Sequence, residues 1–393
     1  MNKIEINEEE FIKKTFQILD MINDSTSFFF YFSPDPDAIG VSIALALFLN
    51  SLEKKSVVYL PNGYDYNLNF LIKIAEYNHI KIIYDVSTVL KHLKKEEFVF
   101  VTCDTPTYRL LPDYKKIFKV WDGYIQKKSI EIDHHFGGDS EQIYSGSETI
   151  FFQANSCCDM IAEFFQIIAT KSTRTNELVT YFPRNIVLSL LVGMCYDTQF
   201  GKFLVNENNY NKWVNFLSER LNNLTWGQSS HMRTANEVFD TINKMSEMKL
   251  VTMSNLVDGA LYKNGVGLLI LPMIGKYESL AENGDASCIL NKISSDIANM
   301  LPENAGKIGV FCYYDDIKKQ YLVKIRRSSQ YKGIDLRNFE NDLKKIFGTK
   351  YIGGGGHPGA TSFRMSKLPR TLFVKKMNEL FEVIIDSINN AAD

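Results

Sequence analysis

The chain has 393 residues, 45% of them hydrophobic, and its 44 lysines and arginines nearly balance its 46 acidic residues. This length is too great for one typical hydrophobic core, so we expect two domains and a connector. The net charge of −2 excludes a broad basic surface that would hold long duplex nucleic acid through counterion release. This charge is compatible with binding of a small anionic ligand at a local site.

The first half of the chain alternates between short apolar runs and helical stretches. A helix is expected at about residues 8–23. Runs rich in aromatic and β-branched side chains follow at residues 27–32, 98–103 and 129–132. This alternation predicts a parallel α/β sheet over residues 1–215. Such sheets bind ligands at the carboxyl ends of their strands, so the residues that follow each run are the first candidates for a site.

The second half begins with a polar, proline-free stretch at residues 216–250, which predicts a helical connector. Beyond it, residues 251–393 predict a second, smaller α/β domain. Its expected strands lie at 259–272, 307–314 and 321–326, and its expected helices lie near 287–300, 335–347 and 369–389. The expected fold class is therefore α/β, with two domains joined by helices.

The cysteines and the first residues of the chain bear on the cellular compartment. The six cysteines show no Cys-x-x-Cys spacing and mostly lie in apolar runs, which fits reduced thiols in a cytosolic protein. The first ten residues carry four glutamates and do not resemble a signal peptide. The longest uncharged, mainly apolar stretch, residues 185–196, is shorter than the roughly 20 residues of a membrane-spanning helix. We expect a soluble cytoplasmic protein without a membrane partner.

Acidic residues follow the apolar runs at matching places. Asp35 and Asp37 follow the first run and Asp104 follows the second. The triplet Asp133-His134-His135 follows the third run, and Asp197 follows a further apolar segment. We expect these side chains to converge at strand ends, where crowded carboxylates repel one another unless cations neutralise them. Oxygen-rich ligands with one or two imidazoles suit Mn²⁺ or Mg²⁺ rather than a thiolate zinc site, so the pattern predicts a divalent metal pair.

These residues also have plainer alternative roles. Asp37 could cap the helix that follows it, and Asp104 and Asp197 could form turns through their own backbone. Adjacent histidines on an extended chain point in opposite directions. One of His134 and His135 would then ligate a metal, and the other would face substrate or support a ligand. Both could also be ordinary loop histidines.

Gly353 to Gly356 form a run of four glycines that precedes His357. Glycines expose backbone N–H groups, so a loop of this kind can wrap a phosphate or a carboxylate, and His357 adds a donor. Arg326 ends an expected strand and offers forked guanidinium donors for the same anion. The alternatives are a glycine loop without a ligand and, for the neighbouring Arg327, a solvated side chain.

Two adjacent cysteines, Cys157 and Cys158, open a helix after Asn155 and Ser156. This setting favours helix-start packing with Asn155 or Ser156 as the cap, rather than a nucleophilic role. The single histidines elsewhere lie in helical or connector contexts, which favours surface or hydrogen-bonded roles.

These motifs, in this order, resemble the DHH phosphoesterase superfamily, in the branch with a carboxyl-terminal DHH-associated domain. That branch includes nanoRNA and pAp phosphatases and cyclic di-AMP phosphodiesterases. The resemblance covers nearly the whole chain, from the Asp35-Pro36-Asp37-Ala38-Ile39-Gly40 motif to the glycine run with His357. It implies a catalytic DHH domain with a parallel sheet at residues 1–215, a helical connector at 216–250 and a substrate-binding DHH-associated domain at 251–393.

The resemblance also implies roles for single residues. One metal ion would be held by Asp35 and Asp104. The other would be held by Asp37, Asp104, His134 and Asp197, so that Asp104 bridges the two. His135 would lie beside the scissile phosphate, and the expected catalytic residues are therefore Asp104, His134 and His135. The expected substrate-binding residues are Arg326, Gly355, Gly356 and His357.

The chain departs from the family pattern at one position. Where the family has a histidine three residues before the proline of the first motif, this chain has Tyr31. A phenol with a pKa near 10 is a poor neutral ligand for a hard cation, so the first metal site is expected to be weakened. Asp35 and Asp104 survive, and water can complete the shell of Mn²⁺ or Mg²⁺. Ser33 is the local candidate to replace the imidazole.

The expected function is hydrolysis of small nucleotides or short oligonucleotides, such as nanoRNA, pAp and linear or cyclic dinucleotides, by two Mn²⁺ or Mg²⁺ ions. One alternative is a nucleotide-binding regulator that has lost catalysis, which Tyr31 motivates. The other is an inorganic pyrophosphatase or polyphosphatase. The sequence leaves open which nucleotide and which cation are used, and whether the chain forms a homodimer.

Overall fold

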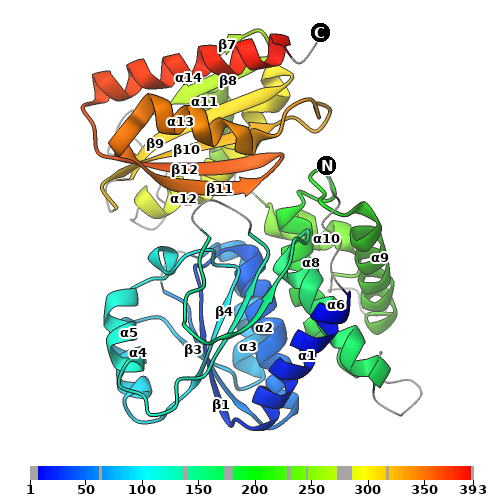
Figure 1. Ribbon diagram of the computed structural model, residues 1–393. Helices are drawn as coiled ribbons and strands as arrows, with labels where there is room; N and C mark the ends of the chain where they lie inside the picture. The colour runs from blue at the N-terminus through cyan, green and yellow to red at the C-terminus, as the bar shows by residue number, and fades with distance from the viewer. Residues whose placement is uncertain are drawn as a thin grey trace. The chain divides into compact units, whose positions relative to one another are not determined.

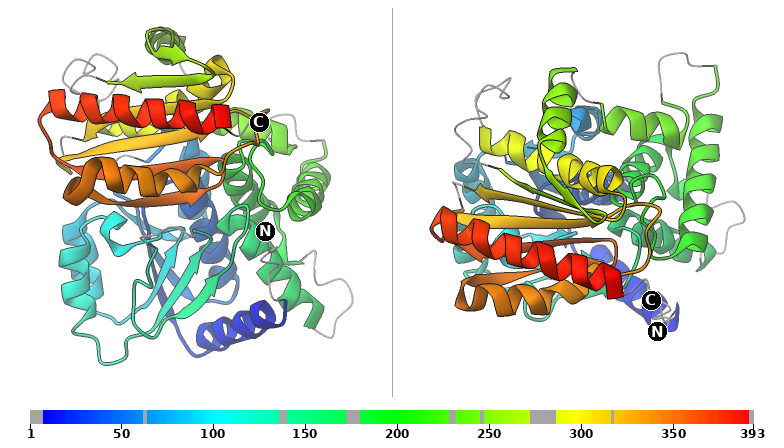
Figure 2. Two further views of the ribbon diagram at one scale, coloured as in Figure 1. Left: turned by 45° about the horizontal axis from the view of Figure 1, so that its top comes forward. Right: turned by 90° about the horizontal axis from the view of Figure 1, so that it is seen from above.

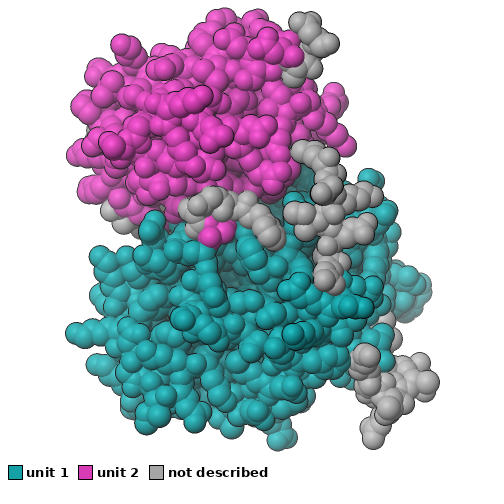
Figure 3. Space-filling view, in the orientation of Figure 1, with its two compact units in different colours: residues 1–135, 141–244 teal, residues 136–140, 245–393 magenta. Residues whose placement is uncertain are grey.

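The computed structural model describes residues 8–61, 64–135, 140–171, 180–227, 232–244, 247–271, 286–315 and 318–390. The chain divides into two compact units, residues 1–135 with 141–244 and residues 136–140 with 245–393 (Figure 3). Within the described residues, each unit contains one six-stranded sheet. The α/β class expected from the sequence is confirmed.

The sheet of the first unit is parallel throughout, as predicted. Its strand order is β3-β2-β1-β4-β5-β6. The strands are β1 (Ser27–Tyr31), β2 (Lys55–Tyr59), β3 (Lys81–Ile83), β4 (Val99–Cys103), β5 (Ser129–Asp133) and β6 (Glu148–Phe151). The chain builds the sheet outward in one direction from β1 and then in the other from β4. The carboxyl ends of these two strands therefore flank the point where open α/β sheets bind ligands.

Side chains that alternate along the strands enter two cores on the two faces of this sheet. Phe28 and Phe30 lie in one core, and Phe29 and Tyr31 lie in the other. The first core takes residues from α1 (Glu8–Asn23), α2 (Pro36–Ser51), α3 (Asn69–Tyr77), α6 (Cys157–Lys171), α8 (Arg184–Asp197), α9 (Glu207–Leu224) and α10 (Ala235–Ile242). The second core takes residues from α4 (Val86–Leu93) and α5 (Tyr114–Trp121), which cover the opposite face of the sheet (Figure 1).

Helix α2 is apolar on all sides, and its residues 36–49 are buried. A helix of this kind is stable only inside a protein, and α2 contacts both the sheet and α8. Its first turn, which carries Asp37, is therefore held inside the protein rather than at the surface.

The sheet of the second unit is mixed, with the order β11-β12-β10-β9-β8-β7. The strands are β7 (Leu261–Lys263), β8 (Val266–Ile270), β9 (Ile308–Asp315), β10 (Gln320–Arg327), β11 (Tyr351–His357) and β12 (Ala360–Ser366). Strands β8 and β9 are parallel, and the other neighbours are antiparallel. The predicted second α/β domain is thus present.

Helices cover both faces of this second sheet. On one face, α13 (Phe339–Phe347) and α14 (Arg370–Asn390) form a core with Val323, Ile325 and Phe363. On the other, α11 (Glu247–Asp258) and α12 (Ala286–Ala305) pack against Phe311 and Tyr313. Figure 2 shows α12 and α14 on opposite sides of the strands. In the described parts of both units, every helix is too short or too polar to cross a membrane.

The glycine run does not form the predicted loop. Gly353 to His357 belong to β11, an edge strand that pairs with β12. A Cβ at Gly354 would lie 2.3 Å from the backbone oxygen of Ser362, and one at Gly356 would lie 2.2 Å from that of Ala360. Gly356 also has φ +147°, which side chains rarely adopt. Gly354 and Gly356 are therefore needed so that β11 can lie close against β12.

Candidate metal centre

Asp35 and Asp37 lie at the start of α2, the helix that follows β1. The side chain of Asp35 accepts a hydrogen bond from the backbone N–H of Ala38 at 2.8 Å and caps the helix. The capping role considered for Asp37 therefore belongs to Asp35. Asp37 is fully buried, and its carboxylate accepts hydrogen bonds from the backbone N–H groups of Cys157 at 2.6 Å and Cys158 at 3.0 Å.

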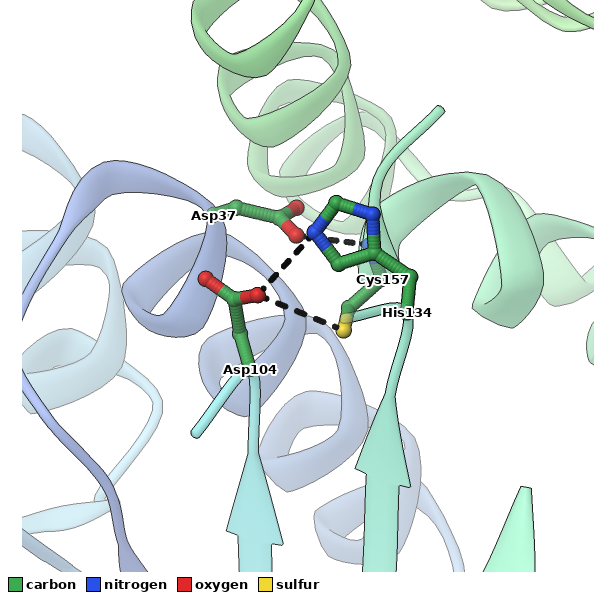
Figure 4. Close-up of side chains that lie close together, drawn as sticks. All are labelled: Asp37, Asp104, His134 and Cys157. Carbon is green, nitrogen blue, oxygen red and sulfur yellow. Dashed lines mark hydrogen bonds and ion pairs between the residues drawn. The ribbon is translucent and has the colours of Figure 1, made fainter. Parts of the chain in front are cut away.

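Asp104 and His134 bring the ends of β4 and β5 together. Asp104 directly follows β4 and has a left-handed backbone with φ 49°. Its Oδ1 lies 3.2 Å from Nε2 of His134, which follows the end of β5 (Figure 4). The same Nε2 lies 3.2 Å from Oδ2 of Asp197. Asp197 is the last residue of α8, so the residues that follow three strands meet one helix end here, rather than strand ends alone.

The imidazole of His134 shows that this cluster requires a positive charge. Its Nδ1 lies 3.2 Å from the backbone oxygen of Ala154, which fits a proton on Nδ1 and a lone pair on Nε2. Nε2 is buried and makes no hydrogen bond of good geometry within the described residues. Burial lowers the pKa of His134, but Asp104 and Asp197 outweigh it and raise that pKa. A lone pair that faces two carboxylates is stable only if a proton or a metal ion lies between them. The donor set therefore fits a divalent cation.

The pKa values of the carboxyl groups lead to the same conclusion. Burial raises the pKa of Asp35 and Asp37 well above the usual value, and the charges of Asp104 and Asp197 raise both further. Burial also raises the pKa of Asp197. For Asp104, burial acts upward, but His135 and His134 outweigh it and lower the pKa. The acids therefore cannot all ionise at neutral pH without added positive charge.

Adjacent histidines on an extended chain were expected to point in opposite directions, but His134 and His135 do not. Their ring centroids lie 4.6 Å apart. His135 Nδ1 is 2.7 Å from Oδ1 of Asp133 and 3.4 Å from Oδ1 of Asp104. Strand β5 ends at Asp133, so the alternation of a strand does not apply to the next two residues. The side chain of His134 is 9% exposed and that of His135 is 32% exposed, which leaves His135 accessible to a ligand.

Cys157 lies within the cluster, although its sequence context favoured a packing role. Ligand atoms of Asp37, Asp104, His134 and Cys157 all lie within 4.8 Å of one another. The Cys157 thiol contacts Oδ1 of Asp104 at 3.8 Å and the backbone oxygen of Ile132 at 3.4 Å. Burial, together with the charge of Asp104, raises the pKa of this thiol well above its usual value, which favours the protonated thiol as a weak donor. Cys157 is the first residue of α6, and this position is the sequence signal that could have indicated that it lies near the other ligand atoms.

Tyr31, at the position where the resemblance implies a histidine, makes its contacts in the core of the sheet. Its side chain is fully buried in the core between the sheet and α4 and α5, where it packs against Tyr59 and Phe118. Its hydroxyl donates to the backbone oxygen of Pro112 at 2.5 Å. Ser33 donates its backbone N–H to Oγ1 of Thr105 at 3.1 Å.

The four predicted substrate residues lie at one end of the strands β10, β12 and β11. Arg326 and His357 both pair with Ala360, from the two sides of β12. Two strand spacings separate Arg326 from His357 by about 10 Å. Gly355 and Gly356 lie next to His357 on the edge strand. Arg326 donates to the backbone oxygens of Ile325 and Thr361.

Sequence reasoning missed further basic residues near these residues. Lys324 and Arg364 alternate with buried residues along β10 and β12 and so share the sheet face of Arg326. Two-residue spacing along a strand is the signal that could have found them. Arg327, for which we favoured a solvated side chain, donates to the backbone oxygen of Ile334 at 3.0 Å.

No protein-family model and no curated protein matches the chain. Among solved structures, an exopolyphosphatase-related protein from Bacteroides fragilis is similar, with a TM-score of 0.65 and 18% identity over 95% of this chain and 97% of that one. A putative family II inorganic pyrophosphatase from Methanococcus jannaschii has a TM-score of 0.40 and 15% identity, over 91% of this chain and 100% of that one. RecJ from Thermus thermophilus in complex with Mn²⁺ has a TM-score of 0.43 and 10% identity, over 96% of this chain and 54% of that one. The first likeness shows that the chain shares the fold of that protein over nearly its whole length.

Proposed function

We propose that this protein is a DHH-type, two-metal-dependent phosphoesterase that hydrolyses small nucleotides or short oligonucleotides, such as nanoRNA, pAp and linear or cyclic dinucleotides. The observation that carries the proposal is the buried Nε2 of His134, which lies 3.2 Å from carboxylate oxygens of both Asp104 and Asp197. Such a donor set serves a hard divalent cation such as Mn²⁺ or Mg²⁺.

The metal ions would be held by the acids at the strand ends. Asp35 and Asp104 would hold one ion, and the other would be held by Asp37, Asp104, His134 and Asp197. When bound, such ions lower the pKa of a water molecule and offset the charge that develops on a phosphate group. Asp104 is common to both ligand sets and would contact both ions.

His135 would act on the substrate rather than on a metal. Asp133 holds its Nδ1 at 2.7 Å, which fixes the ring and leaves Nε2 as the free end. The partial exposure of this side chain lets a phosphate oxygen reach it. A histidine oriented by a carboxylate in this way can donate a hydrogen bond or a proton to the substrate.

The second unit would bind the rest of the substrate through Arg326, Gly355, Gly356 and His357. Strand β11 is the edge strand of its sheet, so only one side of its backbone pairs with β12. Glycines at this edge permit a close approach of an anionic group. The near-neutral net charge favours short substrates over long nucleic acid.

The direct test is product release from pAp, linear pApA, cyclic di-AMP, a short RNA and inorganic pyrophosphate at increasing Mn²⁺ concentration. The wild type should release phosphate or mononucleotide from at least one nucleotide. Asp104→Ala should lose this activity and keep its circular dichroism spectrum. Turnover that survives in Asp104→Ala contradicts the mechanism, and a preference for pyrophosphate contradicts the proposed substrate class.

A second candidate, a nucleotide-binding regulator without catalysis, is favoured by the position of Tyr31. The first metal site has Tyr31 in place of the imidazole of the family pattern. The Tyr31 hydroxyl donates to the backbone oxygen of Pro112 instead. In this case the wild type would bind nucleotides and remain inactive at every Mn²⁺ concentration. Activity gained by Tyr31→His would support the regulator, and turnover by the wild type would contradict it.

A further inference from the structure

Asp37 is surrounded by three helices that leave its carboxylate one orientation. It is part of α2, its oxygens meet the first residues of α6, and Gly193 of α8 lies against it. We infer that Gly193 and the first backbone amides of α6 are positioning elements that hold Asp37 as a metal ligand. This inference rests on the proposed function, because it assigns to Asp37 a role in cation binding.

The amides of α6 hold both oxygens of the carboxylate. The N–H of Cys157 donates to Oδ2 at 2.6 Å, and that of Cys158 donates to Oδ1 at 3.0 Å. These N–H groups belong to the first turn of a helix, where amides have no partner within the helix and the helix dipole favours negative charge. The two bonds hold both oxygens of the carboxylate, and each oxygen has a second lone pair beyond the one that accepts the amide.

Gly193 provides the space in which Asp37 fits. A Cβ at this position would lie 2.0 Å from Oδ1 of Asp37, 2.9 Å from its Cγ and 2.5 Å from the sulfur of Cys158. All three distances are shorter than real Cβ contacts, so the carboxylate would have to move. The backbone of Gly193 is helical, so glycine is needed here for its lack of a side chain and not for a special φ angle.

The start of α6 is itself fixed by a buried polar network. Oδ1 of Asn155 accepts hydrogen bonds from the backbone N–H groups of Val205 and Asn206, both at 2.9 Å. Nδ2 of Asn155 donates to Asp159 at 2.8 Å, and Asn209 donates to the other oxygen of Asp159 at 2.9 Å. Asn155 and Asp159 are both buried. The network ties the first turn of α6 to the segment before α9, so the amides keep their positions when Asp37 is charged.

A purely structural role for Gly193 predicts different results from a positioning role. If the glycine served only the packing of α8 against α2, substitution would lower stability and leave cation binding unchanged. If it positions Asp37, substitution should weaken cation binding beyond any effect on stability. Losses of about 10- to 100-fold in metal affinity are typical when groups that orient a ligand are changed.

The first experiment compares Gly193→Ala with the wild type by calorimetric titration with Mn²⁺ and by thermal unfolding in the presence of a chelator. We expect Mn²⁺ affinity to fall about 10- to 100-fold. Gly259→Ala is the matched control, because the nearest atoms to its added Cβ are 3.5 and 3.6 Å away. In an Asp37→Ala background, Gly193→Ala should cause no further loss of affinity. Unchanged Mn²⁺ affinity in Gly193→Ala overturns the inference.

A second pair of variants tests the amides, even if Gly193→Ala fails to fold. Cys157 is the first residue of α6, where proline is tolerated, so Cys157→Pro removes one N–H donor to Asp37 while Cys157→Ala keeps it. Mn²⁺ affinity should be lower in Cys157→Pro than in Cys157→Ala, and equal affinities contradict the inference. Turnover is scored separately. A wild type that binds Mn²⁺ but hydrolyses no nucleotide contradicts the proposed function and leaves this inference standing.

Discussion

His134 and Asp197 meet at 3.2 Å, although one follows a strand and the other ends a helix. The contact joins β5 to α8, and Asp104 from β4 lies at the same distance from the same nitrogen. Parallel strands aim their carboxyl ends at one edge of the sheet, and α8 reaches that edge because it packs along α2. The site is therefore assembled from residues that are distant in sequence.

Substitutions of the two histidines should have different effects on metal binding and on turnover. His134→Asn should weaken Mn²⁺ binding at least about tenfold, because it removes the nitrogen that lies between Asp104 and Asp197. His135→Asn should keep Mn²⁺ affinity and lose turnover of pApA, because His135 is the more exposed ring and is held by Asp133. Calorimetric titration with Mn²⁺ and steady-state kinetics measure the two effects. Equal losses of Mn²⁺ affinity in both variants contradict the assignment.

Tyr31→Phe should lower stability and leave metal binding unchanged. The substitution removes the buried hydroxyl that donates to Pro112 and leaves that carbonyl without its donor, which costs about 1–2 kcal/mol. Urea unfolding measures the loss, with Tyr66→Phe as the control because Tyr66 is 75% exposed. Mn²⁺ affinity is measured on the same samples. Weaker Mn²⁺ binding by Tyr31→Phe would show that the phenol acts as a ligand after all.

The strands that lead to the site could be predicted because their apolar runs have clear ends. Residues 27–32 and 98–103 predicted β1 and β4 to within a residue or two, and the acids that follow them were identified by position alone. Asp197 was harder to place, because α8 is apolar on nearly all sides and a short apolar run of this kind does not distinguish a strand from a buried helix.

Other features depend on contacts that no local pattern contains. The close approach of β12, which requires the glycines at Gly354 and Gly356, is made by a partner strand. The common direction of the two histidines depends on where β5 ends. Gly193 and Cys157 acquire their importance only when α2, α6 and α8 are packed together. Tertiary contacts decide these points, and local propensity does not.

Gly354→Ala should destabilise the second unit. The added Cβ would lie 2.3 Å from the backbone oxygen of Ser362 and 2.6 Å from Cα of Phe363, so β11 would have to move away from β12. Forced overpacking of this kind costs about 1–3 kcal/mol. Thermal unfolding of the full chain should show a lower transition than Gly259→Ala, whose added methyl meets nothing closer than 3.5 Å. Equal transitions would contradict the close packing of the edge strand.

Lys324 should make stability rise with pH above neutrality. Burial, together with the charge of Arg326, lowers its pKa to about 7, while Asp296 acts in the opposite direction. Its ammonium donates to Ser295 at 2.7 Å. In the unfolded chain a lysine titrates near pH 10.4. From about pH 7 to pH 9 the unfolded state therefore holds more protons than the folded state, and the free energy of unfolding increases with pH.

Lys324→Met should remove this pH dependence. The urea midpoint of the wild type should rise from about pH 7 to pH 9 relative to that of the variant, because only the wild type releases a proton on folding there. Lys367→Met is the control, because Lys367 is exposed. Parallel midpoint curves for wild type and Lys324→Met would mean that Lys324 remains charged in the folded protein. In that case it would be a permanent cation beside Arg326 on the sheet face that also carries His357.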